Sequence, residues 1–214
     1  MPDGCIQAGV SAHCVAGCGA LMEQQVVIKR VWSMPSHDTF TVKPIRELIS
    51  AHITNGLWVD PFSRNSPFRE QCITNDLNPE VIADYHLEAL EFLRTFSDES
   101  VDGVLFDPPY SPRQISECYK HVGREVHTRD TQSSFYGDRK KEVARIVKPC
   151  GKVLCFGWNS GGIGKSNGFE LREVLLVPHG GAHNDTICTV EIKNTALASL
   201  DLLQDAGYQT ELMP

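Results

Sequence analysis

The tetrapeptide Asp107-Pro108-Pro109-Tyr110 is the part of this chain best suited to chemistry on an amino group. It follows the apolar run 104–106, which predicts a buried strand that delivers polar groups to a cleft. Asp107 can accept a hydrogen bond from an amine, and the Pro108 carbonyl, whose orientation the next proline constrains, can accept a second. Two acceptors would favour the pyramidal, nucleophilic form of a base amine, and Tyr110 could stack on a flipped-out base. The alternative interpretation is a strand ending in a proline turn, with a capping Asp and a packing Tyr.

Three acidic residues upstream lie where a nucleotide-binding half-sheet would place them. Asp60 ends a strand-like segment, and a polar turn follows Pro61-Phe62. Asp76 follows a second such segment and could accept hydrogen bonds from two ribose hydroxyls. Glu88 opens an apolar-periodic segment, so its carboxylate or backbone could meet an adenine. Each acid taken alone could instead cap a helix or lie in a solvated loop.

These motifs together resemble the adenine-specific DNA N6-methyltransferases, and within them the compact type often encoded by phages and prophages. The resemblance extends from about Phe40 to Lys193, and Asp107 to Tyr110, the DPPY motif, is its most specific part. Segment 40–45 looks like the family's N-terminal motif, and Asp60-Pro61-Phe62 looks like its methionine-binding motif. The resemblance implies S-adenosylmethionine (SAM) as the cofactor. It assigns to the cofactor site Phe40, Val42, Lys43, Pro44, Asp60, Pro61, Phe62, Asp76, Leu77, Glu88 and Ala89.

The same resemblance implies site-specific transfer of a methyl group from SAM to the N6 amine of adenine in DNA, with the adenine flipped out of the duplex and no metal. Asp107, Pro108, Pro109 and Tyr110 would be the catalytic residues. Asp at position 107 favours adenine over cytosine as the acceptor. The alternatives are an RNA adenine N6-methyltransferase, a non-catalytic SAM-binding module that binds nucleic acid, and a zinc-dependent nucleic-acid binder.

One departure from the family concerns the turn after Phe62. The family usually has glycines there, which let the backbone approach the cofactor closely, whereas this chain has Ser63-Arg64-Asn65-Ser66-Pro67. We expect Asn65 to adopt a left-handed conformation in place of a glycine. The affinity for SAM is the property that this departure affects.

The net charge of −7 combines two segments of opposite sign. Residues 59–110 contain three basic and eleven acidic residues, which suits a cationic sulfonium cofactor. Residues 111–148 contain nine basic and five acidic residues, which suits a phosphate backbone, although a solvated helix face is the alternative for the run 139–141. Trp158 and Asn159 follow a late strand at the same edge as Asp107 and could contact the target base. The candidate nucleic-acid-binding residues are Arg113, Lys120, Arg124, Arg139, Lys140, Trp158 and Asn159.

Alternating strand and helix patterns predict the elements that must position these residues. They indicate an α/β protein with the Rossmann-like SAM-dependent methyltransferase fold, in which a seven-stranded, mostly parallel sheet carries helices on both faces. In the resembled fold the last strand runs antiparallel to its neighbours. The expected helices cover 42–53, 113–121 and 139–147. The expected strands lie near 57–60, 71–75, 102–106, 152–156, 171–177 and 186–193, with a short seventh strand near 84–86.

The expected organisation is an N-terminal tail (1–30), a methyltransferase domain (31–194) with a small target-recognition insert near 111–139, and a C-terminal helical tail (195–214). No apolar run is long enough for a membrane span and no signal peptide is visible, so we expect a cytoplasmic protein of a bacterium or of a phage-infected cell. Most of the eight cysteines are expected to be buried thiols. Duplex DNA is the expected partner, and a homodimer is a further expectation. The zinc alternative rests on Cys5, His13, Cys14 and Cys18, whereas loop 179–185 suits an ordinary turn.

Overall fold

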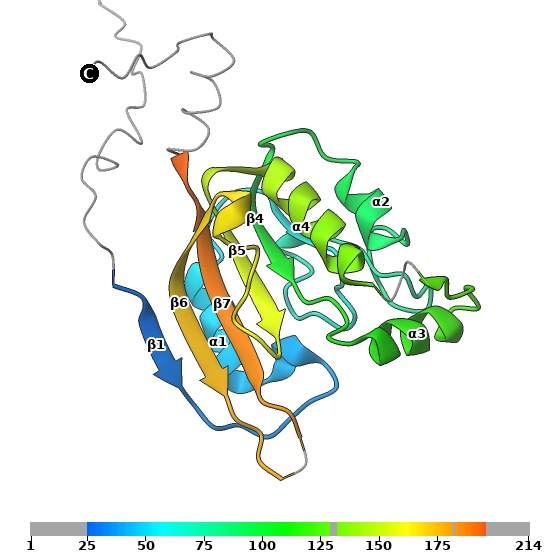
Figure 1. Ribbon diagram of the computed structural model, residues 1–214, viewed down its shortest axis with the longest axis horizontal. Coiled ribbons are helices and arrows are strands. Elements are labelled where there is room, and N and C mark those ends of the chain that lie inside the picture. Colours follow the sequence, from blue (N-terminus) through cyan, green and yellow to red (C-terminus); the bar gives the residue numbers. More distant parts are fainter. Residues whose placement is uncertain (1–24, 129–131, 182, 196–214) are drawn as a thin grey trace, which may run out of the picture.

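One seven-stranded sheet organises the computed structural model, which describes residues 25–128, 132–181 and 183–195 (Figure 1). The strand order is β1-β6-β7-β5-β4-β2-β3, and only β7 runs antiparallel to its neighbours. The expected antiparallel last strand is therefore confirmed. The strands are β1 (Val27–Arg30), β2 (Trp58–Asp60), β3 (Cys72–Thr74), β4 (Val101–Phe106), β5 (Val147–Gly157), β6 (Phe169–Val177) and β7 (Thr186–Lys193).

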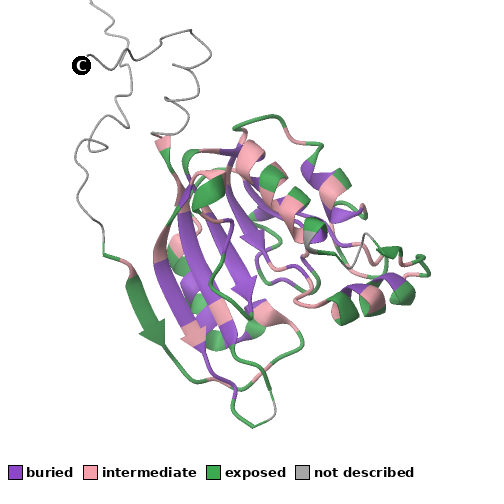
Figure 2. Cartoon of the chain, in the orientation of Figure 1, coloured by how far each residue is buried: buried purple, intermediate pink, exposed green. Residues whose placement is uncertain are grey.

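Helices cover both faces of the central strands. Helix α1 (Lys43–His52) packs on one face through Ile45, Leu48 and Ile49, which recur at helical spacing and are buried. Pro44 lies in its first turn, where a proline costs no hydrogen bond. On the other face, α2 (Ala89–Leu93) and α4 (Ser133–Ile146) pack against β4 and β5, whose residues are mostly buried (Figure 2). A third helix, α3 (Pro112–His121), lies beside the sheet (Figure 1).

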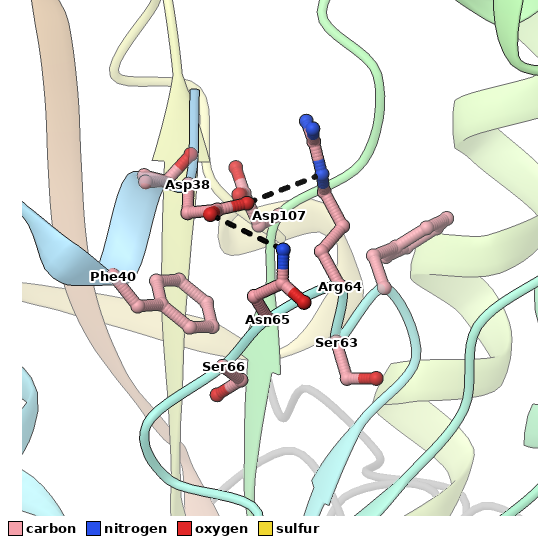
Figure 3. Close-up of a pocket in the computed structure, with 9 residues that line it drawn as sticks. Asp38, Phe40, Ser63, Arg64, Asn65, Ser66 and Asp107 are labelled. Atoms are coloured by element: carbon pink, nitrogen blue, oxygen red, sulfur yellow. Dashed lines mark hydrogen bonds and ion pairs between the residues drawn. The ribbon is translucent and has the colours of Figure 1, made fainter. Parts of the chain in front are cut away.

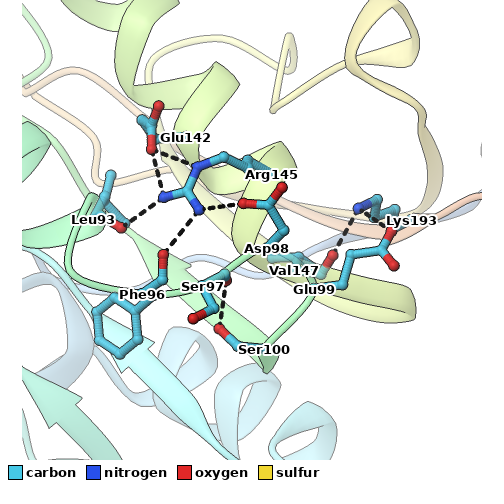
Figure 4. A network of polar contacts seen from close by, with 10 residues as sticks. All are labelled: Leu93, Phe96, Ser97, Asp98, Glu99, Ser100, Glu142, Arg145, Val147 and Lys193. Atoms are coloured by element: carbon cyan, nitrogen blue, oxygen red, sulfur yellow. Dashed lines mark hydrogen bonds and ion pairs between the residues drawn. The ribbon is translucent and has the colours of Figure 1, made fainter.

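Arg145 ties α4 to the connection between α2 and β4 (Figure 4). Its guanidinium donates to the Phe96 carbonyl at 2.9 Å and to the Leu93 carbonyl at 3.3 Å. Leu93 is the last residue of α2. It also contacts the carboxylates of Asp98 and Glu142, each at 2.7 Å. One side chain thus satisfies backbone acceptors at and just beyond the end of α2.

The seventh strand is not the one that the sequence predicted. Segment 84–86 forms only an isolated bridge, between Asn75 and Tyr85. A longer ladder does not form because the Asp84 carboxylate accepts from both the Thr74 N–H and the Thr74 hydroxyl at 2.8 Å, in place of a backbone acceptor. The seventh strand is β1 at the opposite edge, within the stretch expected to be a tail.

Helix α4 and strand β5 also differ from the expected bounds. The helix begins at Ser133 rather than near 139, and the strand begins directly after it at Val147. Pro149 and Gly151 lie in the first part of β5, where Cys150 has φ 62° and the pairing with β4 shifts register.

The remaining expectations are met in part. Within the ranges described, Cys72, Cys155 and Cys188 are buried, as expected for most of the thiols, whereas Cys118 and Cys150 are exposed. The helices of these ranges lack the length and apolar character needed to cross a bilayer. The proposed zinc cluster at residues 5–18 and the C-terminal segment 196–214 lie outside the described residues.

Candidate active site

The carboxyl ends of three parallel strands meet at one edge of the sheet and open into a cleft. Strand β2 pairs with both β3 and β4, so Asp60, Asp76 and Asp107, which end or follow these strands, come from neighbouring positions. The cleft has a volume of about 890 Å³, and Asp76, Asp107 and Tyr110 line it. This is where ligands bind in open α/β sheets.

The tetrapeptide Asp107 to Tyr110 is held from both sides. The Tyr110 N–H donates to Gln114 Oε1 at 2.6 Å, and the Tyr136 hydroxyl donates to the Pro109 carbonyl at 2.6 Å. The Tyr110 hydroxyl donates to Asp107 Oδ1 and lies 3.4 Å from the Thr39 hydroxyl. Among described residues no donor reaches the Pro108 carbonyl. Both Asp107 and Pro108 line the cleft, and the Asp107 carboxylate is thus an occupied acceptor and the Pro108 carbonyl an unbonded one.

The environment of Asp107 sets its charge. Burial raises the pKa of the Asp107 carboxyl to about 6, although hydrogen bonds from Tyr110 and Thr39 and the charge of Arg64 act in the opposite direction. Asp107 is consequently ionised at neutral pH and can accept hydrogen bonds. Burial and the nearby Asp107 charge raise the pKa of Tyr110 well above its usual value, so its hydroxyl remains a donor.

Asp76 orders the loop that follows β2. Its carboxylate accepts from the Arg64 N–H at 2.9 Å and from the Asn78 N–H at 2.8 Å. Arg64, with φ 42°, takes the left-handed conformation expected for Asn65, because its N–H must point at Asp76. The prediction for Asn65 was wrong in position by one residue. Asp38 contacts Arg64 Nε at 3.6 Å and Asn65 Nδ2 at 3.3 Å from the other side (Figure 3).

Asp60 lies beneath this loop and does not line the cleft. It is fully buried, and the Phe62 N–H donates to its Oδ1 at 3.2 Å. In the described chain its Oδ2, close to Ser66, has no partner at hydrogen-bonding distance. Burial raises the pKa of Asp60 to about 8, and the charges of Asp107 and Asp76 add to the effect.

Glu88 has a structural partner that sequence reasoning missed. One carboxylate oxygen caps α2 by accepting from the Leu90 N–H at 2.8 Å, and the other accepts from the Arg139 guanidinium. Arg139 is only 5% exposed and its guanidinium lies 3.4 Å from the centre of the Phe135 ring. Its expected contact with nucleic-acid phosphate is therefore wrong. The reason is that residues 139–141 belong to α4, so successive side chains point in different directions and Arg139 faces the interior.

Lys140 is half-buried near Glu191 on β7. Burial raises the pKa of the Glu191 carboxyl, and the charge of Lys140 partly offsets this effect. Glu191 accepts from the N–H groups of Ile163 at 2.6 Å and Gly164 at 3.0 Å. It thereby anchors the loop that follows β5 and carries Trp158 and Asn159.

Of the other expected nucleic-acid contacts, Trp158 lines the cleft, whereas Asn159 accepts from the Gly161 N–H in an exposed turn. Arg113, Lys120 and Arg124 are exposed on one stripe of α3 and the turn after it, and the adjacent stripe of α3 lines the cleft with Gln114, Glu117, Cys118 and His121. Arg113 pairs with Glu117 at 2.8 Å. Trp158 also lines the cleft, with its ring centre 5.6 Å from that of Tyr110.

The expected cofactor residues divide into two groups. Lys43 is exposed on α1 and pairs with Glu47 at 3.9 Å, while Phe40 packs on Phe156 with ring centres 4.8 Å apart. Phe40 borders a small cavity of about 10 Å³ in the loop region of Figure 3 and is not among the residues that line the larger cleft. Lys43, Pro44 and Asp60 line neither cavity. The expected residues that do line the main cleft are Val42, Pro61, Phe62, Asp76, Leu77, Glu88 and Ala89.

Sequence reasoning missed Thr39, Gln114 and Tyr136. The signal for Gln114 is a capping-box pattern, Ser111-x-x-Gln114, at the start of α3. Nothing in the sequence pointed to Thr39 or Tyr136, because each reaches the tetrapeptide from a distant segment. Within the residues described, no group of three or more metal-ligating side chains occurs.

The comparisons with known proteins agree with this topology. No family model and no curated protein sequence matches the chain. A SAM dependent methyltransferase from Archaeoglobus fulgidus is similar in structure, with 10% identity and a TM-score of 0.51, over 71% of this chain and 92% of that one. TrmN from Thermus thermophilus is 17% identical, with a TM-score of 0.48, and the match covers 71% of this chain and 49% of the TrmN chain. This chain thus spans about half of TrmN, and 44% of PH0851. The fold of this chain is the Rossmann-like fold of the SAM-dependent methyltransferases.

Proposed function

We propose that this chain transfers a methyl group from SAM to the N6 amine of adenine in DNA. One observation carries the proposal: the Asp107 carboxylate and the open Pro108 carbonyl lie at the carboxyl end of β4, in the same cleft as Asp76. An amino group placed there would find two acceptors of different origin, one ionised and one a backbone dipole. This is the arrangement that polarises an amine whose lone pair is delocalised into a ring.

The cleft fits SAM in size and in charge. Its volume of about 890 Å³ lies within the range of small-molecule sites. Asp76, Asp107 and Glu117 give it acidic walls, and Phe62 and Leu77 give it apolar ones. When bound there, SAM would supply a methyl group on a positively charged sulfur. Asp76 sits where an acid accepts hydrogen bonds from ribose hydroxyls in nucleotide-binding folds.

The residues at the acceptor end position and polarise the amine. Asp107 and the Pro108 carbonyl would accept hydrogen bonds from the two N–H groups of the amine. Tyr110 would give up its hydrogen bond to Asp107 and stack on the base. Trp158, already in edge contact with Tyr110, forms the adjoining wall. The amine becomes acidic only as the new N–C bond forms, so Asp107 needs to be a hydrogen-bond acceptor and not a strong base. Most of the rate would come from positioning.

The surface around the cleft supports nucleic acid as the substrate. The exposed basic side chains of Arg113, Lys120 and Arg124 follow directly after the tetrapeptide in sequence. Arg113 and Lys120 lie on α3, which lines the cleft through other residues, and Arg124 follows it, so a phosphate backbone held there would place a flipped base near Tyr110.

Methyl transfer tests the proposal directly. Labelled SAM is incubated with unmethylated duplex DNA and, separately, with RNA, and the modified nucleoside is identified after nuclease digestion. Recovery of N6-methyldeoxyadenosine, lost in the Asp107→Ala variant, is the expected result. Label only in RNA would support an RNA adenine N6-methyltransferase instead, and SAM binding without transfer to either would indicate a non-catalytic module.

A further inference from the structure

The edge strand β1 and the residues after it expose apolar side chains. Ile28 is 69% exposed, Trp32 60% and Met34 67%, and Val27 and Val31 are exposed as well. Figure 2 shows the whole of β1 as exposed. Most of the large apolar side chains that the described residues expose belong to this one segment. An apolar edge strand of this kind is a site for pairing with another strand.

The hydrogen-bond register shows which backbone groups are open. The Val31 N–H donates to the Leu176 carbonyl at 2.9 Å, and the Ser33 N–H donates to the Pro178 carbonyl at 3.1 Å. Backbone groups alternate in direction along a strand, so the N–H and C=O groups of residues 28, 30 and 32 point away from β6. The open edge therefore extends beyond β1 itself, as far as Trp32.

Side chains alternate in the same way. Lys29 lies on the face of α1, where Glu173 pairs with it at 2.8 Å. Ile28, Arg30 and Trp32 share the opposite face, and none of the helices in the described part of the chain covers that face of β6 and β7 in Figure 1. On one face of this edge the charge of Lys29 is neutralised by Glu173. The other face is exposed and apolar except for Arg30.

We propose that β1 pairs antiparallel with β1 of a second copy of this chain, about a two-fold axis at Val31. Two copies present the same edge, so an interface of this kind closes on itself. In this register Arg30 lies opposite Trp32 of the second copy, where the cation can contact the indole, and Ile28 lies opposite Met34.

The neighbouring registers are less favourable. An axis at Lys29 or at Arg30 would place that residue opposite its own copy, and like charges directly opposite destabilise a strand pair. An axis at Trp32 would bring Pro35 into the ladder. Only the axis at Val31 pairs the full segment 28–34 without either conflict. The proposal is independent of the chemistry in the cleft.

Sedimentation of the full chain over a range of concentrations is the first test. The unmodified protein should be a dimer, and Trp32→Lys should make it a monomer by placing a lysine opposite Arg30 of the second copy. Ile82→Lys is the matched control, because Ile82 is 73% exposed in the segment that follows β3 at the other edge of the sheet. A monomer at every concentration would overturn the proposal and leave the edge to another segment of this chain or to a different protein.

A cysteine pair tests the register. Val31→Cys should form a covalent dimer on mild oxidation, because residues opposite one another across an antiparallel pair bring their Cβ atoms to about 5 Å. Val27→Cys, exposed on the same face, lies opposite residue 35 and should not. The unmodified chain serves as the background for the exposed thiols Cys118 and Cys150. A dimer that persists in Trp32→Lys, or cross-links equally through both cysteines, would show that the interface lies elsewhere.

Discussion

Asp107 and Asp76 share a cleft but have different neighbours, so their loss should have different effects. Asp107 bonds to Tyr110, whereas Asp76 orders the backbone at Arg64 and Asn78. We expect Asp107→Ala to abolish methyl transfer while SAM binding persists, and Asp76→Ala to weaken SAM binding first. Calorimetric titration with SAM and a transfer assay measure the two effects separately. Normal turnover in Asp107→Ala would show that the tetrapeptide is not the catalytic site.

Tyr136 holds the tetrapeptide turn but is not among the residues that line the cleft. Its hydroxyl donates to the Pro109 carbonyl at 2.6 Å, and the Pro108 carbonyl immediately precedes that group in the chain. Tyr136→Phe should lower kcat by roughly three- to tenfold, the value of one hydrogen bond, with little change in KM for SAM. Tyr85→Phe is the control, because its ring packs 5.4 Å from Phe92 and its hydroxyl bonds to no described residue. An equal loss in both variants, or a loss confined to KM, would contradict this role.

At the scale of elements, the sequence predicted the helices and strands whose formation depends on the spacing of their own apolar residues. Helix α1 was found from its apolar spacing, and α3 from its periodicity within one residue of its start. The strand that ends at Asp60 and the strand that ends just before Asp107 were found because their apolar runs stop at acids. Strand β1 was missed because its four residues carry two charges and gain their hydrogen bonds from β6, which lies far away in the sequence.

In the candidate site too, features set by local sequence were predicted and features set by distant contacts were not. Asp76, Asp107 and Tyr110 were placed in one cleft from the order of strands alone, since parallel strands end at one edge. Arg139 was misassigned because a run of three basic residues does not say which of them faces inward. The direction of a side chain on a helix depends on what packs against it, here Glu88 from a segment 51 residues away.

The ion pair between Glu88 and Arg139 joins α2 to α4 and should matter for stability. Both side chains are buried, so removing one charge leaves the other without compensation. Arg139→Met should lower the free energy of unfolding by about 3–5 kcal/mol, and adding Glu88→Gln should recover part of the loss. Urea unfolding measures both. Arg113→Met, which breaks the exposed pair with Glu117, should change stability little; a comparable loss there would contradict the argument from burial.

At the scale of the whole molecule, a net charge of −7 opposes binding to DNA unless local positive charge overcomes it. The double variant Lys120→Gln with Arg124→Gln should make the dependence of DNA affinity on salt shallower, by about 0.9 in the log–log slope for each phosphate that the variant no longer neutralises. Filter binding over a range of salt concentrations gives the slope. The exposed pair Arg46→Gln with Arg69→Gln changes the net charge equally and should leave the slope unchanged. Equal effects of the two double variants would show that total charge, and not α3, governs binding.

The buried carboxyl of Asp60 makes the stability of the whole fold depend on pH. Its pKa is about 8 in the folded chain, against 3.8 for the ordinary group, so between these values the folded state holds a proton that the unfolded state has lost. The free energy of unfolding should therefore fall as pH rises from about 4 to about 8, by up to about 1.4 kcal/mol per pH unit from this group. Asp60→Asn, which cannot ionise, should lose this slope, and the difference between the two urea-derived stability curves isolates the contribution.

Asp102→Asn is a control of opposite sign, because the hydrogen bond from Lys148 lowers the pKa of Asp102 and its contribution is lost as pH falls. Parallel curves for Asp60→Asn and the unmodified chain from pH 5 to 8 would mean that Asp60 is ionised in the fold, and that the oxygen with no hydrogen-bond partner carries a charge that the loop compensates.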